Sequence, residues 1–85
     1  MKAKRIIYEN KPIYLPFWIP ARFLVTDIVE VSNHFSGQKT TLPKFAKAVR
    51  DIILMAEMQQ SYKTVRKGLD WFIKYFPKQY MVLLD

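Results

Sequence analysis

The feature that most restricts how this chain can fold is a long apolar pattern of helical period in its C-terminal half. The apolar side chains recur at alternating spacings of three and four, which places them on one face of a helix. A first stripe comprises Leu42, Phe45, Val49 and Ile52, and a second comprises Met55, Met58, Tyr62, Val65, Leu69, Phe72 and Phe76. The pattern therefore predicts helix through most of residues 41–76.

A polar run at residues 59–61 is the one interruption of this pattern. Ser61 within it is a residue type that caps the start of a helix. A single helix of such length would also have little to pack against in a chain of 85 residues. We therefore expect a break near residue 60 and two helices, at residues 41–60 and 61–76.

The outer boundaries of these two helices are marked by residues that start or stop helical structure. Thr41 is the expected N-cap, with Pro43 tolerated in the first turn. Pro77 ends the helical pattern. Beyond it, the apolar tail at residues 77–85 is expected either to pair with the N-terminal arm as a strand or to extend as a hook.

Residues 20–35 favour a third helix. Pro20 suits its first position, and Gly37 suits the exit just beyond it. Apolar residues at spacings of three and four share one face, namely Ala21, Leu24, Ile28, Val31 and Phe35. Several residues here are β-branched, which is typical of a strand. Asp27 and Glu30 are three apart, however, and this spacing breaks a period of two, so we predict a helix.

The N-terminal arm, residues 1–19, is expected to be extended. Pro12 and Pro16 each remove a backbone donor and bias the preceding residue away from helical geometry. Two short apolar runs flank a turn-like segment at residues 9–12, which indicates a hairpin.

These segments together predict one domain, residues 1–85, with a mainly α fold. The expected architecture is a small three-helix bundle with an extended or hairpin-like N-terminal arm and a short apolar C-terminal tail. Apolar residues make up 51% of the chain and aromatic residues 15%. This is more apolar surface than so small a core hides, which favours a binding partner.

The charge of the chain favours anionic partners. Fourteen Lys and Arg against seven Asp and Glu give a net charge of +7, which suits nucleic acid, an acidic protein surface or anionic lipid. Cysteine is absent, which excludes disulfides and thiolate metal sites. We find no transmembrane span and no secretory signal. The expected location is therefore the cytoplasm or an organelle interior.

No set of residues has the pattern of a catalytic or metal site. On the predicted helix, Asp27, Glu30 and His34 lie near one another, but a metal site needs more convergent ligands than these. A solvated face with an ordinary Glu30–His34 pair explains the spacing better. With two glycines, the chain also has no glycine-rich phosphate loop. We expect neither enzymatic activity nor a cofactor.

Basic residues form one candidate binding surface. Seven of them lie in the two C-terminal helices, namely Lys44, Lys47, Arg50, Lys63, Arg66, Lys67 and Lys74. Three of these, Lys63, Lys67 and Lys74, fall on the side away from the apolar stripe, where they would neutralise several phosphates. Lysines give point-charge contacts and read no bases, so such binding would tolerate any sequence. The alternative interpretation is the ordinary charged face of an amphipathic helix.

Aromatic residues form a second candidate surface, for a protein partner. Phe17 and Trp18 crowd the start of the first predicted helix, and exposed aromatics near cations are typical of protein-binding surfaces. An intramolecular face on the last helix is already supplied by Tyr62, Val65, Leu69, Ile73 and Phe76. Trp71 lies roughly opposite the centre of this face and Tyr75 is one turn away. We therefore predict that Trp71 and Tyr75 belong to a docking surface and lie outside the core.

The sequence favours a non-catalytic function. The first hypothesis is a protein interaction module, an accessory subunit or small regulator that docks on a larger assembly through the aromatic arm and the last helix. The second is sequence-tolerant nucleic-acid binding through the lysine-rich face. A peripheral membrane role ranks third, because lysines and aromatics also suit a membrane interface.

Overall fold

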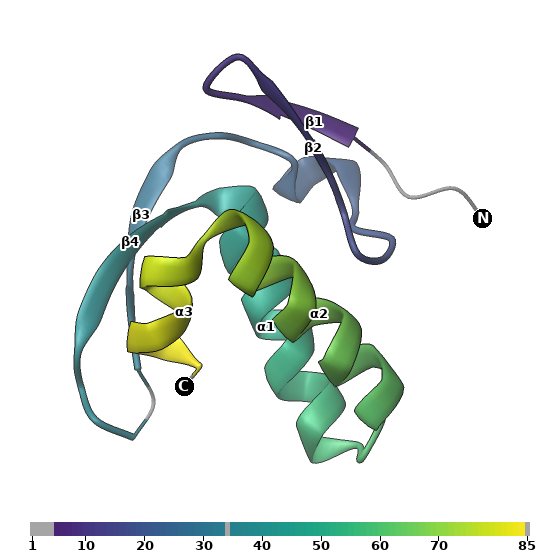
Figure 1. Cartoon of the computed structure of the whole chain (residues 1–85), viewed down its shortest axis with the longest axis vertical. Helices are drawn as coiled ribbons and strands as arrows, with labels where there is room; N and C mark the ends of the chain where they lie inside the picture. Colours follow the sequence, from purple (N-terminus) through teal and green to yellow (C-terminus); the bar gives the residue numbers. More distant parts are fainter. Residues whose placement is uncertain (1–4, 34, 85) are drawn as a thin grey trace.

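The computed structural model describes residues 5–33 and 35–84 and has an α+β fold (Figure 1). In chain order its elements are β1 (Arg5–Tyr8), β2 (Lys11–Tyr14), a 3-10 helix η1 (Ala21–Phe23), β3 (Ile28–Ser32), β4 (Lys39–Pro43), α1 (Lys44–Met58), α2 (Tyr62–Tyr75) and α3 (Pro77–Leu83). Helices account for 49% of the structure, and two antiparallel two-stranded sheets account for 23%. The predicted mainly α three-helix bundle is therefore wrong.

The N-terminal arm forms the β1–β2 hairpin, in agreement with the turn signal in the sequence. Glu9 and Asn10 close the hairpin with φ angles of 51° and 63°. Left-handed geometry at both positions is what a two-residue turn needs to match the twist of its strands. Pro12 lies opposite Ile7. A two-residue turn makes this a pair without ladder hydrogen bonds, so the missing N–H of proline costs none.

Residues 20–35, predicted to be a helix, instead contain η1 and the strand β3. The β-branched residues form a strand because β3 pairs with β4. The prediction of a helix did not include this pairing. Val29 and Val31 are covered on one face of β3, and the alternate side chains are exposed. Asp27 does not break this period of two, because it precedes the strand, where its carbonyl accepts a hydrogen bond from the Lys44 N–H at 2.8 Å.

The pairing of β3 with β4 also moves the start of α1. Thr41, the predicted N-cap, lies within β4 opposite Glu30. Helix α1 begins at Lys44, with Pro43 as its N-cap residue and no side-chain cap. The helix therefore starts later than predicted, because residues 39–43 are used in strand pairing.

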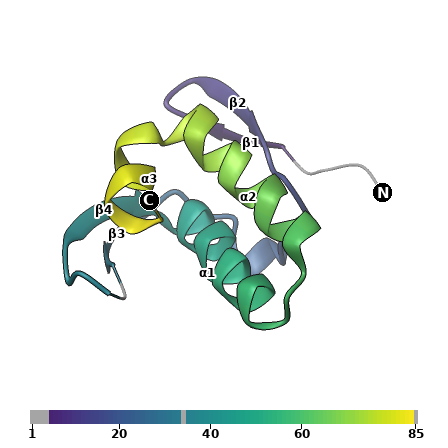
Figure 2. The same cartoon turned by 60° about the horizontal axis from the view of Figure 1, so that its bottom comes forward.

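The break predicted near residue 60 is confirmed. Helix α1 ends at Met58, α2 begins at Tyr62, and Gln60 between them has a φ of 58°. The Ser61 N–H donates to the Ala56 carbonyl at 2.8 Å and so satisfies a carbonyl that the end of α1 would leave free. The two helices form an antiparallel pair (Figures 1 and 2).

The C-terminal tail, predicted as a strand or a hook, forms the short helix α3 instead. Pro77 occupies its first turn, where a missing N–H costs nothing. Asn33 holds the other end of α3, because its Nδ2 donates to the Val82 carbonyl at 2.7 Å. Its Oδ1 accepts from the Phe35 N–H at 2.7 Å. One side chain after β3 thus fastens both its own loop and α3.

The hydrophobic core lies where α1 meets α2, the β3–β4 ribbon and η1 (Figure 2). Its fully buried residues are Ile19, Leu42, Phe45, Ala46, Val49, Ile53 and Phe72. The hairpin side adds Ile13 and Leu15, and α3 adds Leu83. No helix within residues 5–33 and 35–84 has the length and apolar character needed to cross a membrane.

Candidate functional site

Trp71, predicted as a docking anchor outside the core, is buried with 5% of its surface exposed. Its indole Nε1 donates to the Tyr14 carbonyl of β2 at 2.8 Å. Its ring lies 6.3, 5.0 and 5.5 Å, between centroids, from the rings of Phe45, Phe72 and Phe76. The prediction that Trp71 lies outside the core is therefore wrong.

The error arises from the face of α2 that was expected to pack inward. Tyr62 and Ile73, expected on the inner face, are 68% and 49% exposed. The buried residues of α2 are Gly68, Trp71 and Phe72. The β1–β2 hairpin runs along this side of the helix (Figure 2). An apolar pattern within one helix does not reveal a covering element that is distant in sequence.

The other three residues predicted to bind a protein differ in exposure. Tyr75 is half-buried, with the Lys74 Nζ 5.2 Å from its ring centroid. Phe17 is half-buried against α2, close to Gly68. Trp18 is 57% exposed. Of the four predicted aromatic residues, Trp18 is the one that presents most of its side chain to solvent.

A more extensive apolar surface lies on the outer side of α1, between this helix and η1. It is a hollow of about 650 Å³, which we call the α1 groove. The residues that line it are Ile19, Pro20, Arg22, Phe23, Val29, Lys44, Lys47, Ala48, Asp51, Ile52 and Met55. Met55 is 58% exposed and Phe23 is 40% exposed. The groove therefore leaves apolar side chains in contact with water.

The sequence of α1 explains the groove, because this helix is apolar on two sides. Its buried face comprises Phe45, Ala46, Val49, Ile53 and Ala56. A second apolar row, Ala48, Ile52 and Met55, recurs at spacings of four and three and lines the groove. Two apolar sides are typical of a helix that is covered on both. This second row was the available sequence signal, but our prediction assigned Ile52 and Met55 to the core stripe.

Positive charge exceeds negative charge around the groove. Asp51, the one carboxylate in its lining, pairs with Lys47 at 2.8 Å and with Arg50 at 3.0 Å. Arg22 and Lys44 form no ion pair with any residue in the described part of the chain. A partner that carries carboxylates would therefore meet two cations that have no intramolecular counter-charge.

The seven basic residues predicted to bind nucleic acid do not share one surface. Lys44 and Lys47 line the α1 groove. Arg50 turns inward, with 12% of its side chain exposed and its Nη2 donating to the Ser32 carbonyl at 2.9 Å. The basic residues of α1 therefore either line the α1 groove or, in the case of Arg50, form hydrogen bonds within the protein.

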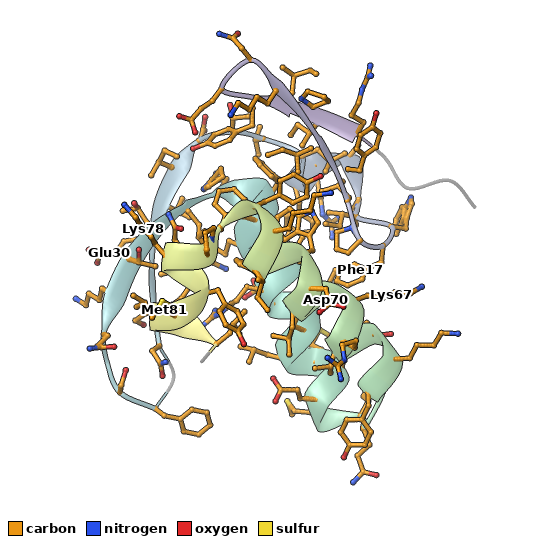
Figure 3. All side chains as sticks on the ribbon, in the orientation of Figure 1. Phe17, Glu30, Lys67, Asp70, Lys78 and Met81 are labelled. Carbon is orange, nitrogen blue, oxygen red and sulfur yellow. The ribbon has the colours of Figure 1, made fainter. Side chains whose placement is uncertain are left out.

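The α2 members are better aligned. Lys63, Lys67 and Lys74 are exposed and fall within about 40° of one another around the helix, a set that we call the lysine row. Arg66 is displaced from the row by about 80°. Among the described residues, none of these four side chains forms an ion pair. Figure 3 shows Lys67 extending from α2 into solvent.

Two hollows follow the lysine row, between α2 and the β1–β2 hairpin, with volumes of about 560 and 460 Å³. Both are lined by Lys74 and Tyr75, so the two hollows adjoin, and we call the pair the hairpin–α2 trough. The further lining residues are Tyr8, Glu9, Lys11, Pro12, Ile13, Phe76 and Gln79 in the first hollow and Tyr14, Pro16, Lys67, Asp70 and Trp71 in the second. The trough thus combines lysines with tyrosine rings.

The structure removes the helical spacing on which a site of Asp27, Glu30 and His34 would depend. Asp27 precedes β3 and Glu30 lies within it. His34 lies outside the described residues. Within residues 5–33 and 35–84, no three side chains of His, Asp or Glu come close enough together to hold a metal ion.

Comparisons with known proteins assign no family to this fold. No protein-family model matches the chain, and no curated protein or solved structure matches it. Two surfaces of the molecule, the α1 groove and the hairpin–α2 trough, therefore remain as the guide to what the protein binds.

Proposed function

We propose that this protein is a non-catalytic interaction module that docks on a protein partner through the α1 groove. The observation that carries the proposal is the second apolar row of α1, Ala48, Ile52 and Met55, which lines an open hollow. Removing apolar surface from water stabilises a complex by about 25 cal/mol per Å², before the costs of association. An apolar depression rimmed by charged residues is typical of a protein interface.

The charges at the groove favour a partner segment that is both apolar and acidic. Arg22 and Lys44 lack intramolecular counter-charges, so carboxylates on the partner would complement them and orient the complex. An amphipathic helix meets both requirements, because its apolar row enters a groove while its flanking side chains reach the rim. The partner proposed is therefore a protein that presents such a helix.

Addition of a partner strand to the β3–β4 ribbon is a weaker alternative. Arg50 already donates to the Ser32 carbonyl at 2.9 Å, and the Gln79 Nε2 reaches the Thr41 carbonyl at 3.5 Å. Pro43 has no N–H to offer. Because these backbone groups at the edges of the ribbon are already bonded within the chain, fewer of them are available to a partner strand. This contrast supports the α1 groove as the docking surface.

The test compares two glutamate substitutions on the same helix. Met55→Glu places a carboxylate in the α1 groove, whereas Met58→Glu places one at a position that is 85% exposed and outside the groove lining. Both variants should melt within about 4 °C of wild type, because exposed substitutions cost little stability. Both variants replace a methionine of α1 by glutamate and change the net charge equally. They differ only in whether the new carboxylate lies in the α1 groove.

Affinity purification from the native host, after nuclease treatment, supplies the readout. The wild type and Met58→Glu should enrich the same protein partner, and Met55→Glu should lose it. With that partner purified, Met55→Glu should weaken binding by about 30-fold, the equivalent of 2 kcal/mol at a central interface residue. Equal enrichment by the two variants would exclude the groove as the docking surface.

A further inference from the structure

We propose that the hairpin–α2 trough binds single-stranded nucleic acid, a function separate from docking at the α1 groove. Sites that bind single strands without sequence preference combine a cationic track with aromatic faces on which bases stack. The trough has both, and its lining shares no residue with the α1 groove.

The cationic track is the lysine row of α2. Lys67 and Lys74 line the trough, and Lys63 continues the row by one turn. At 1.5 Å per residue, the row extends about 16 Å along the helix, which is long enough to follow several phosphates. In the described part of the chain, none of these three ammonium groups forms an ion pair, although the Asp70 carboxylate lies on the same face of α2 between Lys67 and Lys74. They are therefore free to contact a phosphate backbone.

The aromatic face is supplied mainly by Tyr14 of β2, whose surface is 55% exposed. Tyr75 adds a half-buried ring on α2, next to the Lys74 ammonium. Trp71 positions the two elements, because its indole N–H bonds the Tyr14 carbonyl at 2.8 Å. The buried tryptophan thus fixes β2 beside α2, which keeps the Tyr14 ring near the lysine row.

The acidic residues of the trough limit where an anion can lie. Glu9 and Asp70 also line it, against Lys11, Lys67 and Lys74. Phosphates are therefore expected at the three lysines of the row, away from Glu9 at the hairpin turn and displaced from Asp70, which lies on the same face of α2. Among the described residues, the trough lining includes one amide side chain, Gln79, and no arginine, so few groups can read base edges and binding should depend little on sequence. A duplex keeps its bases stacked and offers no free base face to Tyr14, so single strands should be preferred.

The charge contribution is tested by fluorescence anisotropy with a labelled dT12 oligonucleotide from 50 to 200 mM NaCl. Wild-type affinity should fall with salt, by about 0.7 log units per log unit of salt for each phosphate contact. Lys67→Gln with Lys74→Gln should flatten this slope by about 1.4. The control is Lys39→Gln with Lys78→Gln, which removes the same charge outside the trough lining. Figure 3 shows Lys78 on α3, on the other side of the molecule from Lys67.

The stacking contribution is tested by Tyr14→Ser, which removes the ring and no charge. It should weaken dT12 binding by about 5- to 150-fold at fixed salt, the range for loss of one base–aromatic stack, and leave the salt slope unchanged. Melting curves establish that each variant is folded. Three results would overturn the proposal: no binding at 50 mM NaCl, equal losses in the two lysine double variants, or a 12-base-pair duplex that binds as tightly as dT12.

Discussion

The indole of Trp71 joins α2 to the β1–β2 hairpin through an apolar contact and a hydrogen bond. Its ring packs among Phe45, Phe72 and Phe76, while its N–H satisfies the Tyr14 carbonyl. A hydrogen bond of this partly buried kind typically contributes about 0.5–1.5 kcal/mol, so the polar and apolar parts of this side chain both contribute to stability.

Trp71→Ala should therefore destabilise the protein by about 3–5 kcal/mol, the usual cost of truncating a core tryptophan. Trp71→Phe keeps most of the ring contacts and should cost about 1–2 kcal/mol, chiefly through the lost hydrogen bond. The matched control is Trp18→Ala at a 57% exposed position, which should change the free energy of unfolding by less than about 0.5 kcal/mol. Urea unfolding measures all three, and similar losses at the two tryptophans would contradict the assigned core.

Ionisation of Tyr8 should make the stability of the folded protein fall at alkaline pH. Burial of its phenol, and next the neighbouring Glu9 carboxylate, raise the pKa of Tyr8 above its ordinary value of 10.0. The folded state then holds this proton more tightly than the unfolded state. The resulting stability is present below pH 10.0 and is lost as pH rises through the folded-state pKa.

Tyr8→Phe should remove this dependence, because phenylalanine cannot ionise and keeps the ring packed against Phe45. The stability of the wild type relative to Tyr8→Phe should decrease between pH 8 and pH 11, as measured by urea unfolding at each pH. Tyr62→Phe, at a 68% exposed position, controls for the loss of a phenol. A difference between wild type and Tyr8→Phe that stays constant with pH would show that the folded state does not hold the Tyr8 proton more tightly.

Among the elements, those that depend on local sequence were predictable and those that depend on distant pairing were not. The apolar period and the polar run before Ser61 are local, and they correctly predicted α1, α2 and the break between them. Residues 28–32 have a strand-like composition, but their structure depends on pairing with residues 39–43. Without that partner, the spacing of Asp27 and Glu30 favoured a helix. The prediction for the tail at 77–85 was wrong for the same reason, because α3 is held by a hydrogen bond from Asn33, which is distant in sequence.

Gly68 sets the distance between α1 and α2. A Cβ at this position would collide with the Ile53 side chain, including its Cδ1 at 2.6 Å, and Ile53 is fully buried. Helix propensity alone would make Gly68→Ala stabilising by about 1 kcal/mol. Overpacking typically costs about 1–3 kcal/mol, so we expect a net loss of stability.

A double-mutant cycle separates the two effects on Gly68→Ala. In an Ile53→Ala background, the colliding side chain is absent, so Gly68→Ala should become neutral or stabilising by about 1 kcal/mol. Chemical unfolding of the four proteins gives the coupling energy. A stabilising Gly68→Ala in the wild-type background would mean that the helices are not packed as closely as described.

At the scale of the whole molecule, the sequence predicted individual exposed residues better than it predicted extended surfaces. The helical pattern placed Lys63, Lys67 and Lys74 away from the apolar stripe, and the structure confirms that these three side chains are exposed. The α1 groove requires η1 to lie against α1, and the trough requires the hairpin to lie against α2. Both arrangements join segments that are far apart in the chain, so no local spacing predicts them.

The arrangement of these surfaces predicts that they act independently. Met55→Glu lies in the α1 groove, and it should leave dT12 binding at the trough unchanged apart from the fall in net charge from +7 to +6. Met58→Glu produces the same change in net charge, so the two variants should bind dT12 with equal affinity. The two variants should be compared at 0.15 M salt, because charges more than about 8 Å apart are then largely screened. Anisotropy titrations of both variants provide the measurement. Weaker dT12 binding by Met55→Glu than by Met58→Glu would show that the groove and the trough are coupled, or that the oligonucleotide also contacts the α1 groove.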